Sequence, residues 1–550
     1  MDTFERIITT LETYVWSFPV NLLDGNALPL IVVVILGFGI FITLRLGFIQ
    51  VTQFKHAFQV LFGKYDNPDD DGDINHFQAL STALSATVGV GNIAGVAFAI
   101  HIGGPGALFW MWVTAIFGMA TKYAECTLGA HYRTKNPDGT VSGGPMYYIE
   151  KGLGPNWKWL AVLFAIAASI CALLTGNAIQ ANTLADVMNS EFEIPFWITG
   201  LISATLVGAV IIGGIKRIGY VTARLVPLMA IMYVFAGLVI LLLNYDQVIP
   251  GLALIFSNAF NPQAGALGVG SGALILTLTF GVQRGLFSNE AGQGSSPIAM
   301  AASKTDEPVR SGLVGLLGPF IDTLIVCSIT GLVIITTGAW DSYHKTSVLP
   351  AGPNVSYTVD GIDIDETAPR VLVFEDGMPV NGQMLRFRIP VDTMFVDTEY
   401  SIPFTGTIDF TERPVAMDED GNVLARLHGG VVENVASLTT VAFSIGLSPI
   451  IPFGELIVTL AIFFFVISTS ISWSYYGERS IHYLLGEQSV FPYRLVFVLA
   501  HFLGALGSVT VVWSFGDVML GIMAFVNITG LILLSPIIYK LSKQYTDKLK

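Results

Sequence analysis

Residues 85–95 read S-A-T-V-G-V-G-N-I-A-G and carry an unusual set of groups for an apolar stretch. Side-chain and carbonyl oxygens, such as those of Ser85, Thr87 and Asn92, are the ligands that hard cations prefer. Glycine removes the Cβ that would keep a solute away from backbone N–H groups, which suit a carboxylate. Because each glycine weakens a helix by about 1 kcal/mol relative to alanine, the pattern predicts a helix break where a charged solute could bind.

A second stretch, residues 278–297, shows the same weakness and reads L-T-F-G-V-Q-R-G-L-F-S-N-E-A-G-Q-G-S-S-P. Glycines interrupt it at positions 281, 285, 292 and 294, and it contains Arg284 and Glu290. We expect neither stretch to be helical throughout. Non-helical backbone is tolerated at membrane depth only where protein or a water-filled cavity surrounds it, so both stretches indicate the interior of a site.

The glycines of the first stretch could also belong to a nucleotide-binding loop or to a close helix contact. A nucleotide-binding loop is excluded by the spacing of G-V-G-N-I-A-G, by the lack of a preceding strand and by the lack of a P-loop lysine. Close packing of small residues between membrane helices accounts for Gly95 and Gly104. It does not explain why Asn92 stands beside Gly91 in an apolar stretch.

The composition predicts that these stretches belong to a polytopic membrane protein. Of 550 residues, 53% are hydrophobic and 12% are charged, whereas soluble domains have about 25% charged residues. A membrane helix needs about 20 mostly apolar residues, so the apolar runs predict an all-α protein with eleven transmembrane helices. The expected spans are 27–48, 78–101, 105–130, 158–186, 196–214, 220–243, 268–302, 311–338, 452–477, 493–514 and 516–540.

Lysine and arginine in the short connections predict the orientation of these spans. They follow the odd-numbered spans, as Arg45, Lys55 and Lys64 follow the first, whereas loops such as 187–195 hold none. The positive-inside rule then places the N-terminus outside the cell membrane and the C-terminus in the cytoplasm. We expect 1–25 to be an N-terminal interfacial segment and 542–550 to be a cytoplasmic tail.

The two weak spans occupy corresponding positions in the chain. Without the first span, ten remain, and the weak spans are the first members of two sets of five. An odd number of spans inverts the second set relative to the first. Broken segments at matching places of a 5+5 inverted repeat point to the binding site of a secondary transporter, with one extra N-terminal helix here.

Most of the negative charge lies in one connection. The net charge is −14, and residues 340–434 hold 16 Asp/Glu against 6 Lys/Arg. Clusters of β-forming residues between Asp-Gly and Pro turn signals predict an inserted β-rich extracytoplasmic subdomain over 340–430. It would separate spans one to eight, in 26–339, from an outer loop and the last three spans, in 431–541. An insertion without a transport role, a gate cover and a docking surface for an unknown partner all remain open.

The sequence resembles the alanine/glycine:cation symporter family in five motifs. They are T-V-G-V-G-N-I-A-G, G-G-P-M-Y-Y-I-E-K-G-L-G (143–154), G-N-A-I-Q-A-N (176–182), F-G-V-Q-R-G-L-F-S-N-E-A-G-Q-G-S-S-P and S-T-S-I-S-W-S-Y-Y-G-E (468–478). The resemblance implies a leucine-transporter-like fold with one extra N-terminal helix. It also implies Na⁺-coupled uptake of alanine, glycine or a similar small neutral amino acid, with no cofactor other than Na⁺ as the coupling ion. The insertion departs from the family's usual pattern.

The chemistry of a zwitterion assigns roles to the residues of this site. Amides at the first break suit the carboxylate, while unwound carbonyls and a hydroxyl suit the ammonium. Thr469, Trp473 and Tyr476 share one helix face, so the indole could cap the side-chain pocket, although such a stripe also occurs in packed cores. Family similarity makes Gln180 a pocket contact, and an interhelical hydrogen bond is its alternative. The expected substrate contacts are Thr87, Val90, Gly91, Asn92, Gln180, Phe280, Gly281, Thr469 and Trp473.

Na⁺ requires oxygen ligands, which the same region supplies. We expect one cation beside the substrate carboxylate and another between the second and ninth spans, by similarity to the sodium sites of the fold. The expected Na⁺ ligands are Ser85, Thr87, Val88, Asn92, Ser468 and Thr469.

Intramembrane charges suggest further roles. Arg284 and Glu290 are candidates for a paired cytoplasmic gate, and Asp322 could carry a proton, line an ion path or pair with a neighbouring helix. Lys122 and Glu125 lie near a span end, where we expect them to snorkel toward water. A proton-coupled symporter that uses Asp322 is therefore the main alternative. A channel fits two matched breaks less well, and the lack of a nucleophile–base or metal-ligand pattern argues against an enzyme.

Overall fold

The computed structural model is mostly helical. It describes residues 8, 10–11, 14–16, 18–23, 26–67, 69–137, 139–261, 272–341, 344–349, 355–359, 362–363, 371–380, 383–386, 389–391, 393–410, 415–424, 426–431, 435–507 and 510–549.

The helices up to residue 261 follow most of the predicted apolar runs. They are α2 Leu30–Arg45, α3 Ile49–Thr52, α4 Phe54–Leu61, α5 His76–Thr87, η1 Gly91–Gly95, α6 Val96–Gly103, α7 Gly106–His131, α8 Pro145–Leu153, η2 Pro155–Trp157, α9 Lys158–Leu173, η3 Leu174–Ala178, α10 Ile179–Phe192, α11 Phe196–Ile211, α12 Gly214–Leu243 and α13 Tyr245–Phe260. The second half contains α14 Gly272–Asn289, α15 Ser296–Met300, α16 Pro308–Gly315, α17 Leu317–Pro319, η4 Phe320–Cys327, α18 Ser328–Thr336, α19 Val435–Leu447, α20 Glu455–Leu485, η5 Glu487–Ser489, α21 Val490–Leu506 and α22 Thr510–Leu549.

The helices agree in part with the predicted membrane topology. Among the described residues, six apolar helical segments are long enough to cross a membrane, and a bent pair makes a seventh. They are 155–189, 214–243, 308–336, 455–485, 487–506 and 512–549, together with the pair 76–87 and 91–103. The chain is thus a multi-pass membrane protein, whereas the count of eleven spans stays a prediction.

The first predicted break is present. Helix α5 begins with a capping box, in which Asn75 accepts from the Gln78 backbone and Gln78 accepts from the Asn75 backbone. It ends at Thr87, because Val88 is extended with φ −77° and ψ 90°. The chain resumes at an angle of 55° to α5 and runs through η1 into α6.

The second break contains only the later two of the four glycines that we expected to interrupt the helix. We expected Gly281 and Gly285 to interrupt the helix, but both are inside α14. A Cβ at Gly281 would lie 2.5 Å from the Ala107 carbonyl oxygen, so this glycine permits close packing against α7. The helix ends after Asn289, and the turn 290–295 contains Gly292 and Gly294 with φ of 87° and 81°.

Small antiparallel sheets occupy the described parts of 344–431. Their strands are β5 His344–Leu349, β6 Val355–Val359, β7 Ile362–Asp363, β8 Val371–Glu375, β9 Met378–Pro379, β10 Gln383–Arg386, β11 Ile389–Pro390, β12 Met394–Phe395, β13 Gly406–Asp409, β14 Val415–Asp418, β15 Val423–Leu424 and β16 Leu427–Val431. The strand orders are β11-β10-β6-β7, β12-β16-β5 and β15-β14-β13-β8-β9. Leu372, Phe374 and Phe404 belong to a hydrophobic cluster separate from the main core. The proposed status of 340–430 as an extracytoplasmic subdomain stays a prediction.

Two short hairpins complete the strands. They are β1 Pro19–Leu23 with β2 Asn26–Pro29, and β3 Thr134–Lys135 with β4 Val141–Ser142. Most of 1–25 lies outside the described residues, but Trp16 is buried, stacks on Phe287 and donates to the Asp517 carbonyl. This part of the predicted interfacial segment therefore packs into the bundle.

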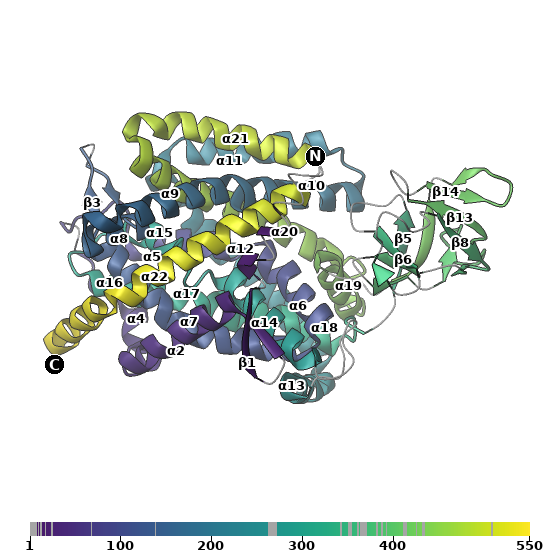
Figure 1. The fold of residues 1–550 in the computed structure, drawn as a ribbon, viewed down its shortest axis with the longest axis horizontal. Coiled ribbons are helices and arrows are strands. Elements are labelled where there is room, and N and C mark those ends of the chain that lie inside the picture. Colours follow the sequence, from purple (N-terminus) through teal and green to yellow (C-terminus); the bar gives the residue numbers. More distant parts are fainter. Residues whose placement is uncertain are drawn as a thin grey trace.

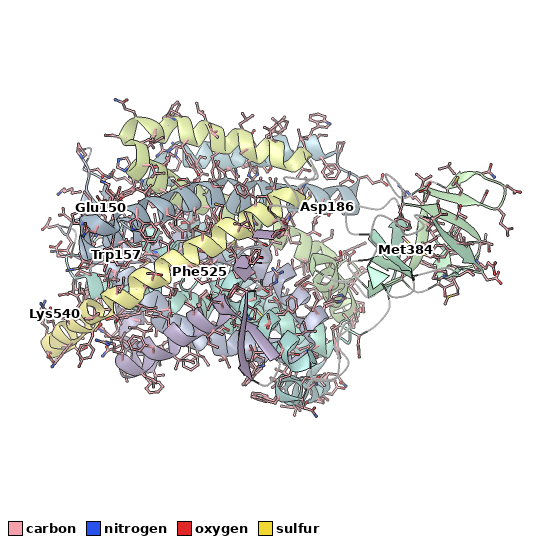
Figure 2. All side chains as sticks on the ribbon, viewed as in Figure 1. Glu150, Trp157, Asp186, Met384, Phe525 and Lys540 are labelled. Carbon is pink, nitrogen blue, oxygen red and sulfur yellow. The ribbon has the colours of Figure 1, made fainter. Side chains whose placement is uncertain are left out.

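The molecule has two different ends along its long axis. Figure 1 shows the sheets of 344–431 at one end, and the β3 hairpin, α16 and the last residues of α22 at the other. We call these the sheet end and the α22 end. In Figure 2, Met384 lies at the sheet end, whereas Glu150 and Lys540 lie toward the α22 end.

Candidate functional site

Asn92 holds the first break together. Its Oδ1 accepts from the Gly89 N–H at 2.8 Å, and its own N–H donates to the Gly89 carbonyl at 3.1 Å. The Val88 N–H still donates to Leu84 of α5 at 2.7 Å. The Asn92 side-chain oxygen therefore stabilises the break itself, and its role as a Na⁺ ligand stays a prediction.

The amide of Asn92 joins the first break to a buried carboxylate. Its Nδ2 donates to Ser288 Oγ at 3.1 Å, to Cys327 Sγ at 3.3 Å and to Asp322 Oδ1. The other oxygen of Asp322 accepts from Ser288 at 2.7 Å and from Thr323 at 2.8 Å. All five side chains are buried. Segments η1, α14 and η4 thus meet in one polar cluster around Asp322.

On another side, α20 supplies the hydroxyls that the sequence predicted. Ser85 Oγ donates to the Ser468 carbonyl at 2.6 Å, and Thr469 Oγ1 donates to the Ser85 carbonyl at 3.2 Å. A Cβ at Gly89 would lie 2.7 Å from Thr469 Oγ1, so the missing side chain lets this hydroxyl reach the break. The predicted Na⁺ ligands Ser85, Ser468 and Thr469 therefore lie together, beside Thr87 and Val88 at the end of α5.

Trp473 packs directly against η3. A Cβ at Gly176 would lie 2.3 Å from Trp473 Cγ, so the indole lies directly on this glycine. Trp473 and Tyr476 form an edge-to-face pair at 5.4 Å, which confirms that they share a helix face. Nearby, Gln180 Nε2 donates to the Thr175 carbonyl at 3.2 Å, and its buried Oε1 has no hydrogen-bond partner.

The remaining predicted substrate contacts divide into two groups. A Cβ at Gly91 would meet no atom within 4 Å, so space is open beside the first turn after the break, next to Val90. Phe280 packs edge-to-face on Phe98 at 5.7 Å, and Gly281 faces α7. The structure gives Gly281 a packing role against α7, and its substrate contact stays a prediction.

Three π-helical segments lie in this region, which the sequence analysis did not anticipate. They are η1, η3 and η4, which carry Asn92, Gly176 and Asp322 respectively. A π-turn redirects backbone and side chains within a helix and is frequent at functional sites. No simple pattern of residues marks these segments in the sequence.

The second break is surrounded by a buried network that the sequence analysis missed. Lys122 is 1% exposed and Glu125 is 0% exposed, so our expectation that they snorkel is wrong. Lys122 Nζ donates to Ser296 Oγ and to the Glu290 carbonyl at 3.2 Å, and it lies 3.5 Å from Glu125 Oε1. Asn527 donates to Glu125 Oε2 and to the Gly292 carbonyl, both at 2.9 Å. An acid and a base three residues apart within a span were the available signal.

Arg284 and Glu290 interact with different groups. The guanidinium of Arg284 lies over the Phe98 ring, 4.4 Å from its centre. The carboxylate of Glu290 accepts from Ser295, five residues later in the same turn. This arrangement does not show the gate pair that we expected, and a gating role for either residue stays a prediction.

A different arginine joins the cytoplasmic ends predicted for the two broken spans. Segment 71–74, before α5, runs beside 302–305, after α15, with bonds from Asp73 N to Ala302 O at 2.8 Å and from Lys304 N to Ile74 O at 2.7 Å. Arg133 donates to carbonyls of both segments. They belong to Asp71 (2.8 Å), Ala301 (3.1 Å), Ser303 (2.7 Å) and Thr305 (2.6 Å). We call these contacts the Arg133 clasp.

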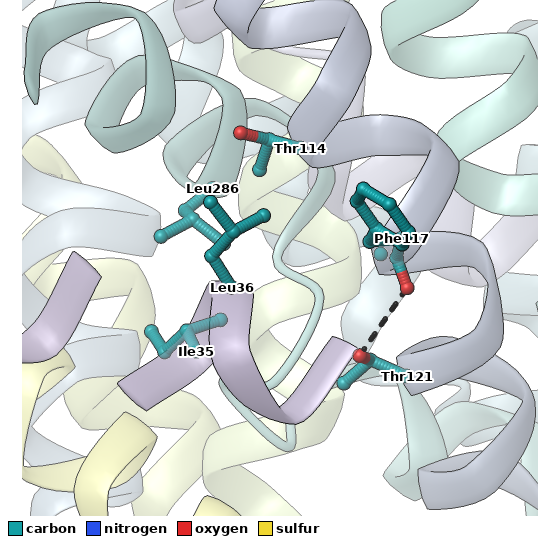
Figure 3. A pocket seen from close by; sticks show the side chains of 7 residues that line it. Ile35, Leu36, Thr114, Phe117, Thr121 and Leu286 are labelled. Carbon is teal, nitrogen blue, oxygen red and sulfur yellow. Dashed lines mark hydrogen bonds between the residues drawn. The ribbon is translucent and has the colours of Figure 1, made fainter. Parts of the chain in front are cut away.

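A small recess lies between α2, α7 and α14, and two of its lining residues, Gly118 and Ile35, lie against Ala291 and Gly292 of the second break. Figure 3 shows its side chains, which are mainly apolar. It is lined by Ile35, Leu36, Thr114, Phe117, Gly118, Thr121 and Leu286. The predicted substrate and Na⁺ residues are not part of this lining.

Comparison with known proteins decides the family. The profile of the sodium:alanine symporter family matches residues 2–356 and 423–550. The chain belongs to the sodium:alanine symporter family. It is therefore a cation-coupled amino-acid transporter and not an enzyme, and the segment between the two matched regions falls within the predicted insertion.

Relatives align with nearly the whole chain. The sodium/alanine symporter AgcS of Methanococcus maripaludis is 40% identical over 99% of this chain and 98% of its own. An uncharacterized transporter of Haemophilus influenzae is 37% identical over 100% and 97%, and the amino-acid carrier protein AlsT of Bacillus subtilis is 29% identical over 100% and 93%. The crystal structure of MhsT in complex with L-phenylalanine covers 86% of this chain and 99% of its own, at 12% identity and a TM-score of 0.48.

Proposed function

We propose that this symporter couples Na⁺ entry to the uptake of small neutral amino acids, such as alanine and glycine, by alternating access. The observation that carries the proposal is the contact of Ser85 with Ser468 and Thr469 at the end of α5. These side chains bring hydroxyl and carbonyl oxygens from two spans to one place beside a helix break. Hard cations require such a set of oxygens.

The hydroxyls can exchange their partners when a cation binds. In the structure the hydroxyls of Ser85 and Thr469 each donate to a carbonyl of the neighbouring span, and that of Ser468 donates to the Phe465 carbonyl of its own helix. A hydroxyl can rotate to offer its lone pairs to a cation, and the released carbonyl becomes a ligand as well. Cation binding would thus replace direct contacts between α5 and α20 by contacts through the ion. The buried carboxylate of Asp322 adds a negative charge that favours the cation.

The substrate would lie at the same break, beside Gly91. The open space there allows the backbone N–H groups that follow the break to face a carboxylate. Trp473 would limit the size of the substrate side chain, and the close contact of its indole with Gly176 would hold it in place. Each additional methylene would change binding by about 1–3 kcal/mol, so discrimination among small side chains would be graded.

We also propose that the α22 end faces the cytoplasm and that the sheets of 344–431 lie outside. Figure 1 supports this orientation, since the β3 hairpin and the end of α22 lie at one end and the sheets at the other. Lys135 and Lys548 lie at the α22 end, and the positive-inside rule places such residues in the cytoplasm.

Proton coupling is the alternative to Na⁺ coupling. Asp322 favours it, because a buried acid that contacts both α14 and the first break could be protonated in one step of the cycle. In that case the carboxyl group of Asp322 would carry the proton, and the hydroxyls of α20 would have no ion to bind.

Uptake of radiolabelled alanine into proteoliposomes tests both proposals. We expect accumulation with an inward Na⁺ gradient and none with choline in its place. Accumulation driven equally well by a pH gradient without Na⁺ would favour the alternative. If alanine, glycine and serine all fail to enter under any cation gradient, both proposals are wrong.

A further inference from the structure

Lys122 meets the second break in the way that a bound cation would. Its ammonium contacts a backbone carbonyl in the break, a hydroxyl of α15 and a carboxylate of α7. These groups belong to Glu290, Ser296 and Glu125. The oxygens come from three segments and converge on one buried positive charge.

The backbone at the break is shaped for this contact. Glu290 has φ of 54°, a left-handed conformation that is strained for a residue with a Cβ. Its carbonyl accepts from Lys122, and the Gly292 carbonyl accepts from Asn527. The Ala291 N–H donates to Asn289 Oδ1 at 2.9 Å. Side chains of the protein itself thus satisfy the backbone groups that the turn exposes.

Burial makes a purely space-filling role for Lys122 costly. A lysine buried in a membrane span destabilises the protein unless its charge is paired. A methionine of similar length would fill the same space without that cost. The ammonium must therefore supply something that an apolar side chain cannot, and its three oxygen contacts are what the structure shows.

We infer that Lys122 is the built-in cation of the second break, which therefore takes no transported cation. Lys122 is a positioning residue: it holds the turn 290–295 through oxygens that would otherwise attract a mobile ion. The inference rests on the proposed function in so far as it confines the coupling ion to the first break.

Three variants test this inference by thermal unfolding of the full-length protein in detergent. Lys122→Met removes the charge and keeps the volume, Lys122→Met/Glu125→Gln also neutralises the facing carboxylate, and Lys122→Arg keeps the charge. The unfolding temperature of each is measured in NaCl, KCl and choline chloride. For each variant we compare the increase in unfolding temperature when choline chloride is replaced by NaCl or by KCl.

We expect K122M to show a rise several degrees larger than that of the wild type, because a mobile cation then replaces the ammonium. K122R and the double variant should return to the wild-type rise. Equal rises in K122M and the wild type would overturn the inference. If K122M does not fold, the double variant should still fold and show the wild-type rise. Loss of both variants would mean that the lysine stem holds the break, which also overturns it.

Uptake separates this inference from the proposed function. In proteoliposomes, we expect the Na⁺ dependence of alanine uptake to be steeper in K122M than in the wild type, and K122R to restore it. A cation response in unfolding without alanine uptake by the wild type would contradict the proposed function alone. Uptake by the wild type with no change of the cation response in K122M would contradict the inference alone.

Discussion

Both helix breaks expose backbone N–H and carbonyl groups, but different side chains bond these groups at each break. At the first, neutral groups satisfy the backbone: Asn92 bonds both the N–H and the carbonyl of Gly89, and Thr469 donates to Ser85. At the second, the full positive charge of Lys122 bonds the Glu290 carbonyl. Neutral donors can turn toward an incoming ion, whereas a tethered ammonium already occupies the position of one.

The two breaks, which the sequence predicts to occupy matching places in the chain, are thus satisfied by different partners. The carboxylate that faces each break differs in its surroundings. Asp322 accepts only from uncharged side chains in the bonds that the structure records, whereas Glu125 lies beside an ammonium. A cation that approaches Asp322 gains a new partner, but one that approaches Glu125 must displace Lys122. We therefore expect the first break to respond to Na⁺ and the second to stay unchanged.

The largest expected effect follows from neutralising the carboxylate at the first break. Asp322→Asn removes an acceptor whose hydrogen bonds to a charged group are worth about 1.5–3 kcal/mol each. We expect the apparent affinity for Na⁺ to fall roughly 10- to 100-fold in alanine uptake. Asp69→Asn, at an exposed position, is the control and should leave the Na⁺ titration unchanged. An unchanged Na⁺ titration in D322N would show that Asp322 does not make the first break responsive to Na⁺.

A smaller effect is expected from filling the space beside the first break. Gly91→Ala adds a Cβ that meets no protein atom, so we expect stability to stay equal or to rise by up to about 1 kcal/mol. The methyl group should collide with the substrate and raise the apparent KM for alanine about tenfold, a loss of about 1.4 kcal/mol. Gly37→Ala also meets no atom within 4 Å but lies in α2, so its uptake should be normal. Normal uptake by G91A would place the substrate elsewhere.

The glycine patterns explain which parts of the two breaks could be predicted. The weak helix around Gly89 was located from sequence, because glycine, asparagine and hydroxyls together are rare in an apolar run. Gly281 and Gly292 show the limit of this reasoning. One permits close packing on α7 and the other allows a turn with φ of 87°. Both positions exclude a Cβ, so the sequence shows the same residue for two physical reasons.

The buried network around Lys122 and the hydrogen bonds of Asn92 could not be predicted from the sequence, because they depend on depth in the fold and on side-chain direction. Lys122 and Glu125 lie near the end of a predicted span, where a long side chain can usually reach water. Their partners are distant in sequence: Glu290 and Ser296 meet Lys122, and α22 brings Asn527 to Glu125 from a position 402 residues away. For Asn92, the sequence predicted a ligand role, which stays a prediction, but not that its side-chain oxygen accepts from the Gly89 N–H. Such partners follow from the tertiary fold and not from local spacing.

A still smaller effect on uptake is expected where the Arg133 clasp joins the segments that continue the two breaks. Arg133→Lys keeps the charge, but a lysine ammonium cannot reproduce the planar fork that reaches four carbonyls. We expect a loss of about 1.5–3 kcal/mol in the free energy of unfolding, seen as a lower unfolding temperature, and a few-fold change in uptake. Arg217→Lys is a matched control, because Arg217 donates to one exposed carbonyl. Equal effects in R133K and R217K would show that the clasp does not couple the breaks.

The smallest effect is expected from Asp71, which meets the clasp in two ways. Its carbonyl accepts from Arg133, while its carboxylate accepts from Lys135 at 2.7 Å on the exposed surface. The hydrogen bond from Lys135, together with its charge, lowers the pKa of Asp71 below the usual value of 3.8. Because the folded-state pKa is lowered, this contribution to stability is present above pH 3.8 and is lost as the pH falls through the folded-state pKa.

Asp71→Asn removes the carboxylate and keeps the carbonyl, so it separates these two roles. Between pH 5 and 8 we expect its unfolding temperature to lie slightly below that of the wild type by a constant amount, since exposed ion pairs are weak and screened by salt. The two proteins should converge as the pH falls below 3.8. If D71N instead lowers the unfolding temperature as much as R133K does, the surface charge holds the segments together, and the carbonyls bonded by Arg133 do not.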